Sequence, residues 1–213
     1  MRLPEGSLLR PFLAQRLSEV NKAKAKRSLG QLQGKIGEMP MARGFQGALA
    51  AHFKASGKPG VIAELKGGSP FDSSFRKIIP YKALAEDFEA VGAACLSVAV
   101  ERRSFAGSFS DLATVHDAVQ IPVLAQDIVA DPYQMLEARL AGADAVILSA
   151  GLLGEQLAAF IERRRLRLMR WFKSTPRPNL TRRLPRAPNS FASPIAISII
   201  LRSSPAPAKR CYR

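Results

Sequence analysis

The sequence predicts an α/β fold built on a parallel sheet, because short apolar runs alternate with amphipathic helix patterns. Each run holds five to nine residues and is almost continuously apolar, as expected of a strand that is covered on both faces. The four runs are Val61–Leu65, Ala94–Val100, Ile121–Val129 and Ala145–Ala150. They begin roughly 23–33 residues apart, which leaves room for one helix in each interval and indicates repeated βα units.

Helix patterns fill these intervals. They cover Tyr81–Val91, Leu112–Val119 and Tyr133–Leu140. The third of them is entered through Asp131-Pro132 and closed by Gly142, which are typical start and stop signals of a helix. Before the first strand, we expect a loop over Gly34–Gly44, which contains Pro40, and a short helix over Phe45–Lys54.

The first strand ends in an acid and a base. Glu64 and Lys66 stand at alternate positions, so both side chains leave the same face of the strand. A buried ion pair seldom stabilises a sheet, whereas charged groups at the ends of parallel strands form the active sites of α/β barrels. The alternative is a surface pair at a fraying strand end. The Gly67–Pro70 turn lacks the third glycine of a dinucleotide-binding fingerprint, so a barrel is favoured over a doubly wound sheet.

Several ordered blocks resemble one family. They read V-I-A-E-L-K-G-G-S-P, A-C-L-S-V-A-V-E-R-R-S-F-A-G-S, I-P-V-L-A-Q-D-I-V-A-D-P-Y-Q and E-A-R-L-A-G-A-D-A-V-I-L. The chain thereby resembles indole-3-glycerol-phosphate synthase over about residues 10–162, where F-L-A-Q-R-L-S-E-V-N-K is similar to the extra helix before that family's (β/α)8 barrel. The resemblance implies a carboxy-lyase of tryptophan biosynthesis. It closes the ring of 1-(2-carboxyphenylamino)-1-deoxyribulose 5-phosphate with loss of carbon dioxide and water, and uses no metal or organic cofactor.

The resemblance also assigns site residues. Glu64 and Lys66 match the family's acid and base after the first strand, so Glu64 is expected to be catalytic and Lys66 to bind substrate. Ser69 and Pro70 match its Ser-Pro turn. Phe105 matches the aromatic residue of F-x-G-S that stacks on the anthranilate ring. These residue types suit the reaction, because a cation holds a carboxylate and an acid moves protons.

Two positions depart from the family's pattern. Arg103 falls where we place the general-acid lysine, and its guanidinium cannot readily release a proton near neutral pH. Gln126 falls on the lysine of the family's R-K-D-F block and carries no charge. Loss of a general acid costs about 100- to 10,000-fold in rate. We therefore expect Arg103 as the catalytic cation and Gln126 as a substrate-binding residue, with very low turnover.

The composition changes within one or two residues of Glu162. Residues 163–213 hold 14 of the 32 Lys and Arg residues and none of the 17 Asp and Glu residues. All 15 glycines precede residue 155, whereas seven of the 15 prolines lie in 163–213. The net charge of +15 therefore belongs to one segment and not to a binding face of the whole chain. We divide the chain into an N-terminal helical extension (1–58), the first half of a barrel (59–162) and an aberrant basic segment (163–213).

A shifted reading frame accounts for the basic segment. Shifted by one base under ordinary codon choices, Trp171–Thr181 yields V-V-Q-V-H-T-E-A-E-L-D and Arg186–Ser198 yields G-A-E-F-I-R-V-T-H-R-D-L. The family has similar blocks, L-V-E-V-H and G-A-R-F-I-G-V-N-N-R-D-L. The alternative is a basic arm that binds nucleic acid or acidic lipid through its charge, with Trp171 and Phe172 stacking. Under the frameshift hypothesis the segment is disordered and leaves the barrel open, which favours self-association.

The remaining signals concern compartment and partners. Cys95 lies in the second apolar run, so we expect it to be a buried core thiol. Two cysteines so placed argue against a disulfide framework and for the cytoplasm. We find neither the apolar core of a signal peptide nor a run of membrane-spanning length. His52 and His116 have no metal ligands at a suitable spacing. We expect a phosphorylated small molecule as the partner, and neither a membrane nor nucleic acid.

Overall fold

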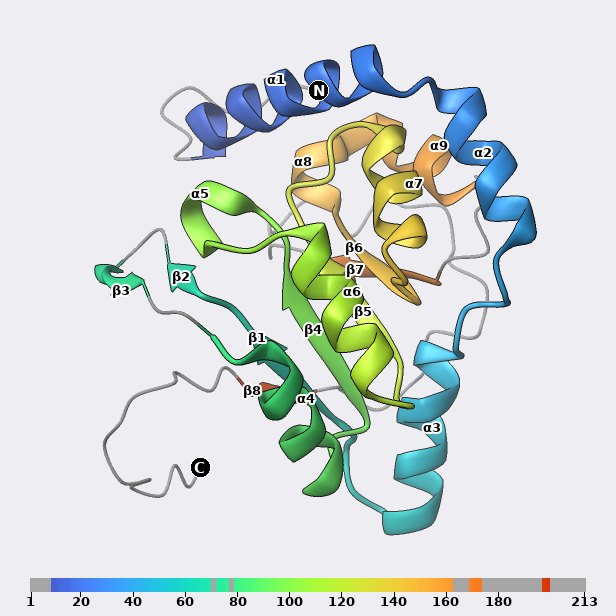
Figure 1. Ribbon diagram of the computed structural model, residues 1–213. Helices are drawn as coiled ribbons and strands as arrows, with labels where there is room; N and C mark the ends of the chain where they lie inside the picture. The colour runs from blue at the N-terminus through green and yellow to red at the C-terminus, as the bar shows by residue number, and fades with distance from the viewer. Residues whose placement is uncertain (1–8, 70–71, 77–78, 163–168, 174–196, 200–213) are drawn as a thin grey trace.

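The structure is a computed structural model that describes residues 9–69, 72–76, 79–162, 169–173 and 197–199 (Figure 1). Its centre is a six-stranded sheet in the order β7-β6-β5-β4-β1-β8, in which all neighbours pair in parallel. The strands are β1 (Val61–Leu65), β4 (Cys95–Ala99), β5 (Val123–Gln126), β6 (Ala145–Ser149), β7 (Met169–Lys173) and β8 (Ile197–Ile199). The first four of these are the four predicted strands, so the predicted α/β sheet is confirmed.

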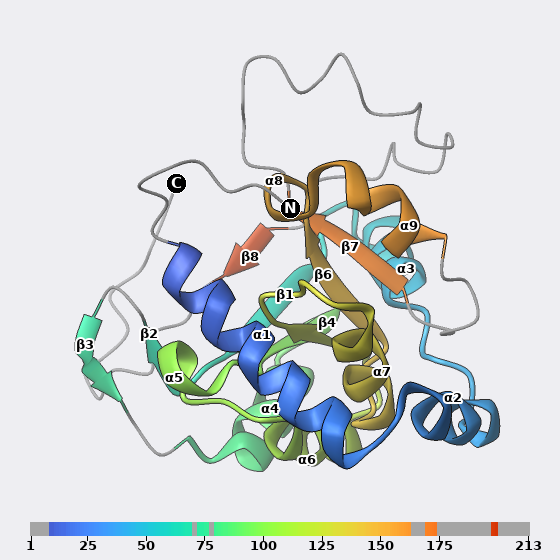
Figure 2. The same cartoon turned by 90° about the horizontal axis from the view of Figure 1, so that it is seen from above.

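The sheet forms part of a barrel. Seen from above, its strands follow an arc with β8 and β7 at the two ends (Figure 2). Within the described residues these two end strands do not pair with each other, so the ring is incomplete. An incomplete (β/α)8-type barrel is the fold class that the sequence predicts.

The segment from residue 163 contributes more than we expected. Residues 169–173 form β7 and pair along the whole of β6, and residues 197–199 form β8 beside the first three residues of β1. We expected few contacts between this segment and strand one, but residues 197–199 pair with β1. The backbone explains this, because an exposed edge of a parallel sheet offers unpaired N–H and C=O groups to any extended segment that reaches it.

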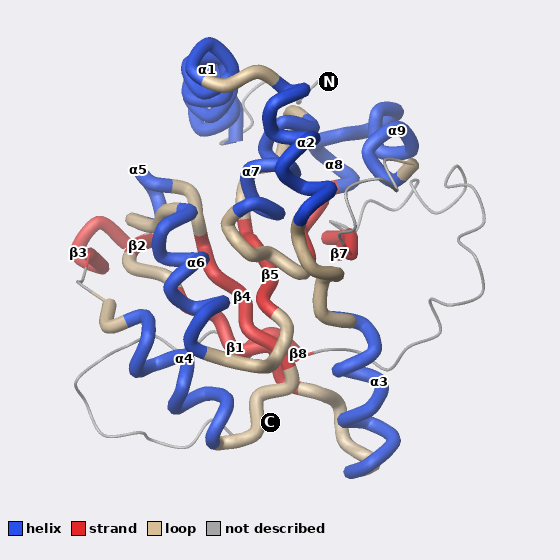
Figure 3. The backbone as a smooth tube through the Cα atoms, turned by 45° about the vertical axis from the view of Figure 1, so that its right-hand side comes forward, coloured by secondary structure: helices blue, strands red, loops and turns tan. Residues whose placement is uncertain are grey.

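Helices cover the outer face of the sheet (Figure 3). They are α4 (Tyr81–Ala90), α6 (Phe109–Ala118) and α7 (Pro132–Leu140), and each matches a predicted helix. Asp131 caps α7 in a capping box with Gln134, and Gly142 follows its end with φ 95°, as the start and stop signals indicated. Short elements complete the chain: α5 (Arg102–Phe105), α8 (Ala150–Leu153), η1 (Gly154–Gln156), α9 (Leu157–Ile161), and a hairpin of β2 (Gly68–Ser69) and β3 (Asp72–Arg76).

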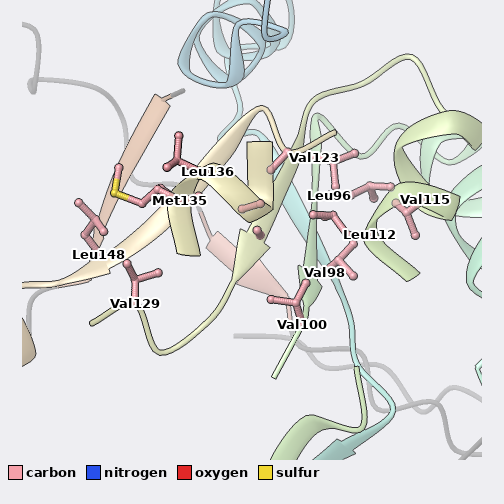
Figure 4. Close-up of a cluster of buried hydrophobic side chains, with 14 of the residues drawn as sticks. Leu96, Val98, Val100, Leu112, Val115, Val123, Val129, Met135, Leu136 and Leu148 are labelled. Carbon is pink, nitrogen blue, oxygen red and sulfur yellow. The ribbon is translucent and has the colours of Figure 1, made fainter. Parts of the chain in front are cut away.

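Alternation along the strands separates two apolar clusters. Ala63 and Leu65 of β1 pack in the main core with side chains of the outer helices. Figure 4 shows part of this core, where Leu96 and Val98 of β4 lie beside Leu112 and Val115 of α6. Ile62 belongs to the second cluster instead. The face that carries Ile62 and the residues in phase with it is called the inner face below.

Helix α3 (Phe45–Ser56) closes the lower end of the inner face. Its fully buried Phe45 packs on one inner-face residue near the start of each of β1, β4, β5 and β6, namely Ile62, Cys95, Leu124 and Ala145. Cys95 is a buried core thiol, as predicted. Burial, together with the negative charge of Asp144, raises the pKa of its thiol to about 12. In the four strands β1, β4, β5 and β6, this end of the inner face is therefore apolar packing.

The N-terminal residues form two further helices, α1 (Leu9–Lys26) and α2 (Leu29–Glu38). The loop predicted over Gly34–Gly44 is wrong over residues 34–38, which belong to α2. Ser28 forms a capping box with Gln31, and Leu32 and Ile36 lie one turn apart in the core. The cap and this buried pair outweigh the helix-weakening glycines.

Arg43 fixes the last part of this N-terminal extension to the barrel. The guanidinium of Arg43 donates to the carbonyl oxygens of Val119 and Ile121, at 2.7 and 3.1 Å, and to that of His116 at 3.1 Å. The backbone N–H of Arg43 donates to Asp144 Oδ1 at 2.7 Å. These bonds hold the segment that precedes α3 against the loop between α6 and β5.

A substitution at Gly107 tests how closely the chain packs at the C-terminal end of β4. A Cβ atom at this position would lie 1.8 Å from the carbonyl oxygen of Ala99. We expect Gly107→Ala to lower the free energy of unfolding by about 3 kcal/mol or more, because backbone must move to relieve the overlap. Urea titration measures this loss.

Gly34→Ala is the matched control. Its Cβ would meet nothing within 4 Å in the middle of α2. This change should raise the stability by up to about 1 kcal/mol, because alanine favours a helix. Equal stabilities of the two variants would contradict the close approach at Gly107.

Candidate active site

The inner face carries an acid and a base at the end of β1. Glu64 and Lys66 lie in phase with Ile62 and opposite to Ala63 and Leu65, whose side chains pack in the outer core. Lys66 Nζ lies 3.1 Å from Glu64 Oε2, and the two side chains are 14% and 4% exposed. Oε2 nevertheless accepts no hydrogen bond from any described residue. The pair is therefore held by charge alone, and one carboxylate oxygen keeps its capacity to accept a proton or a hydrogen bond.

Two polar side chains lie on the same face of the neighbouring strands. Ser97 of β4 stands directly beside Glu64 in the sheet register, and Gln126 is the last residue of β5. Ser97 Oγ donates to Gln126 Oε1 at 3.1 Å. Ser97 is 5% exposed and Gln126 half-buried. Three adjacent parallel strands thus contribute a carboxylate, an ammonium, a hydroxyl and a carboxamide to one face, and we call these four side chains the polar row.

Phe105 is fixed beside the end of β1 by the glycine turn. The backbone N–H of Gly67 donates to the carbonyl oxygen of Phe105 at 3.0 Å. A Cβ on Gly68 would lie 2.9 Å from the carbonyl oxygen of Ser104, so this approach requires glycine. The two glycines after β1 therefore bring α5 and its half-buried Phe105 next to the polar row.

The other predicted site residues are Ser69, Pro70 and Arg103. Ser69 is half-buried in β2, and Pro70 lies outside the described residues. Arg103 is exposed on α5, where its backbone N–H donates to Glu101 Oε1 at 2.9 Å. The second oxygen of Glu101 accepts from Ser104 N at 2.6 Å, so Glu101 caps α5. The structure thus brings Glu64, Lys66 and Gln126 together on one face and places Arg103 on an exposed helix.

Helix α1 lies across the end of the sheet that carries the polar row (Figures 1 and 2). It is anchored there by Arg16, which donates three hydrogen bonds of 2.6–3.1 Å to the carboxylate of Asp127. Asp127 follows Gln126 and also accepts from Gln134 Nε2 at 2.9 Å and from the N–H of Ile128 at 2.8 Å. Helix α1 is therefore attached one residue beyond the polar row.

The ion pair of Arg16 with Asp127 is almost fully buried. The Arg16 side chain is 10% exposed and that of Asp127 is 4% exposed. Burial by itself opposes the positive charge of Arg16, but the hydrogen bonds and charges of Asp127 and Glu19 outweigh burial and raise its pKa above the ordinary value. Phe109 covers the guanidinium at 5.8 Å from the ring centroid. Since breaking a buried pair strands one charge away from water, this contact is costly to open.

Sequence reasoning did not find Ser97, Asp127 or Arg16. Ser97 could have been found, because it is the polar residue in an otherwise apolar strand and falls in phase with the predicted inner positions. No sequence pattern joins Arg16 to Asp127, which are 111 residues apart. Their contact depends on how α1 crosses the finished sheet.

The polar row suits recognition of an anion that also carries a donor group. The Lys66 ammonium attracts a carboxylate or phosphate, and Glu64 can accept a proton or a hydrogen bond. Gln126 can donate a hydrogen bond but cannot supply a proton at neutral pH.

Two other kinds of site are missing from the part of the chain that the structure describes. There, no three His, Cys, Asp or Glu side chains are grouped as metal ligands. None of the described helices is long and apolar enough to cross a membrane.

The Arg16 anchor can be tested through α1 itself. We expect Arg16→Ala to speed amide hydrogen exchange across α1 by about 10- to 100-fold, because hydrogen bonds between charged groups contribute about 1.5–3 kcal/mol. Lys24→Ala is the matched control on the same helix, since the Lys24–Asp131 pair at 2.5 Å is more exposed. The control should change exchange by less than about 5-fold. Equal effects would contradict the anchoring role of Arg16.

Comparison with known families adds independent evidence. The family model of indole-3-glycerol phosphate synthase matches residues 9–166, which is more than half of the 213-residue chain. The matched region runs from α1 through β6 and α9, so it contains every residue of the polar row and the Arg16 anchor. The fold agrees with this match, because parallel strands alternate with helices around part of a barrel. The chain belongs to the indole-3-glycerol phosphate synthase family of tryptophan biosynthesis.

Proposed function

We propose that this chain binds 1-(2-carboxyphenylamino)-1-deoxyribulose 5-phosphate at the polar row and turns it over very slowly. The family is one of carboxy-lyases, and its match supports this class of substrate. The observation that carries the proposal is the Glu64–Lys66 pair, which is buried on the inner face at the end of β1. A buried ion pair that adds little to stability is best explained by a charged ligand.

Each side chain has a role that follows from its chemistry. Lys66 would hold the carboxylate that leaves as carbon dioxide. Glu64, with one oxygen free of hydrogen bonds to the described residues, would take a proton during ring closure. Phe105 would pack on the anthranilate ring from the end of α5. Ser69, at the start of the β2–β3 hairpin, would contact the ribulose portion, as would the neighbouring Pro70, which lies outside the described residues.

The proposal of slow turnover rests on Arg103 and Gln126, the two positions where the family has a lysine. Ring closure with loss of water requires an acid that protonates the departing hydroxyl, and a carboxamide cannot do this. Arg103 retains a positive charge but holds its proton too tightly to act as an acid. The site therefore keeps the groups that bind and lacks the group that protonates.

The same observation favours a second candidate, a member of the family without catalytic function. Gln126 is consistent with a binding protein or with the product of a frameshifted gene. The nucleotide sequence around the codon for Glu162 distinguishes these cases. A one-base slip before an otherwise intact barrel frame supports the frameshifted gene, and a continuous frame supports a diverged protein.

A single substitution tests the missing acid. We expect Gln126→Lys to raise turnover of the family's substrate by about 100-fold or more over the unmodified chain, because it supplies a proton donor next to Ser97. Indole-3-glycerol phosphate formed per unit time is the measurement. Gln126→Met is the matched control, since it has similar length and no acid, and it should give no gain.

Two outcomes would contradict the proposal. One is family-like turnover by the unmodified chain, which would show that Gln126 is no obstacle. The other is unchanged substrate affinity in Lys66→Ala, because the ammonium is proposed to hold the substrate carboxylate.

A further inference from the structure

We infer that Ser97 is a positioning residue, which fixes the Gln126 carboxamide so that its Nε2 donates a hydrogen bond to an oxygen of the bound ligand. The inference deepens the proposed function and rests on it for the identity of the ligand. It assigns a role to a buried serine at the centre of the sheet. It also gives Gln126 the role of an uncharged hydrogen-bond donor, in addition to the loss of the positive charge that the family has at this position.

The first step concerns the position of Ser97. It lies in β4, which pairs with β1 on one side and β5 on the other. In this register Ser97 stands beside Glu64 of β1, and its own hydroxyl reaches Gln126 at the end of β5. At 5% exposure it is a polar side chain inside an otherwise apolar strand. A buried hydroxyl lowers the stability of a protein unless it forms a hydrogen bond, and here its partner is Gln126.

The second step concerns the carboxamide. A glutamine side chain has one acceptor oxygen and an NH2 group with two donor hydrogens. The Ser97 hydroxyl occupies Oε1 at 3.1 Å, and among the described residues nothing accepts a hydrogen bond from Nε2. Because the amide group is planar, holding Oε1 against β4 also fixes the direction of Nε2. The half-buried side chain thus keeps a donor for a ligand.

The third step concerns the acceptor on the other side of Ser97. Glu64 Oε2 is buried, lies 3.1 Å from Lys66 Nζ, and accepts no hydrogen bond from the described residues. The polar row therefore offers a cationic donor and an anionic acceptor beside β1 and a neutral donor at the end of β5, on either side of β4. This set fits a ligand in which a carboxylate or keto oxygen lies near an N–H or O–H group. The 2-carboxyphenylamino group of the proposed substrate has this arrangement.

A double-mutant cycle on the full chain tests the role of Ser97. The variants are Ser97→Ala, Gln126→Leu and the double variant, and the probe is 1-(2-carboxyphenylamino)-1-deoxyribulose 5-phosphate, whose Kd is read from its own fluorescence. We expect Ser97→Ala to weaken binding by about 2- to 12-fold, as for loss of one neutral hydrogen bond. In the Gln126→Leu background the same change should alter Kd by less than about 1.5-fold, because Ser97 acts through Gln126.

A conservative variant and two contrary results complete this cycle. Ser97→Thr keeps the hydroxyl and should retain more affinity than Ser97→Ala. Equal losses from Ser97→Ala in both backgrounds would show that Ser97 does not act through Gln126, and would overturn the inference. No loss in the otherwise unmodified chain would also overturn it.

A measurement without ligand separates this inference from the proposed function. The side-chain NH2 signals of Gln126 in a ¹⁵N–¹H spectrum should move in Ser97→Ala. Those of Gln134, which is bonded to Asp127 and Ile128, should stay in place. Unmoved Gln126 signals would overturn the positioning by Ser97. If they move but the unmodified chain does not bind the probe, the proposed function and its ligand fail, while the positioning of the carboxamide stands.

Discussion

Parallel backbone pairing of β4 with β1 and β5 sets the place of every side chain in the polar row. The register puts Glu64 beside Ser97. Gln126 pairs with Ala99, which follows Ser97 by two residues and so lies on the same face of β4. The same pairing turns Ala63, Leu65, Leu96 and Val98 outward, where the helices bury them. Since one shift of register would exchange the two faces, apolar burial on the outside holds the polar groups on the inside.

The two ends of the inner face differ in chemistry for a physical reason. At the lower end, α3 inserts Phe45 among apolar side chains, so water and ligands are excluded. At the upper end, the strands stop and α1 crosses above them, attached through Arg16 and Asp127. Stability is thus concentrated at one end and binding groups at the other, which is the usual division in an α/β barrel.

The charge balance of the polar row supports the proposal that this chain binds its substrate and turns it over slowly. Glu64 and Lys66 offset one another's charge at 3.1 Å. A second cation at position 126 would leave a net positive row that attracts an anionic substrate more strongly. Gln126 keeps the row neutral and bonds to Ser97 instead. Under the proposal, the site has a fixed neutral donor in place of an acid.

The sequence by itself determined the alternation of strands and helices, the caps of α7, the buried thiol and the pairing of Glu64 with Lys66, because all of these follow from local periodicity and spacing. It did not determine α2, where burial of Leu32 and Ile36 overrides the glycines. Only the tertiary structure decided that Ser97 reaches Gln126, that Arg103 stays exposed, that β8 lies beside β1 and that Arg16 meets Asp127. These contacts join residues that are distant in sequence, and their partners are fixed only when strands and helices pack.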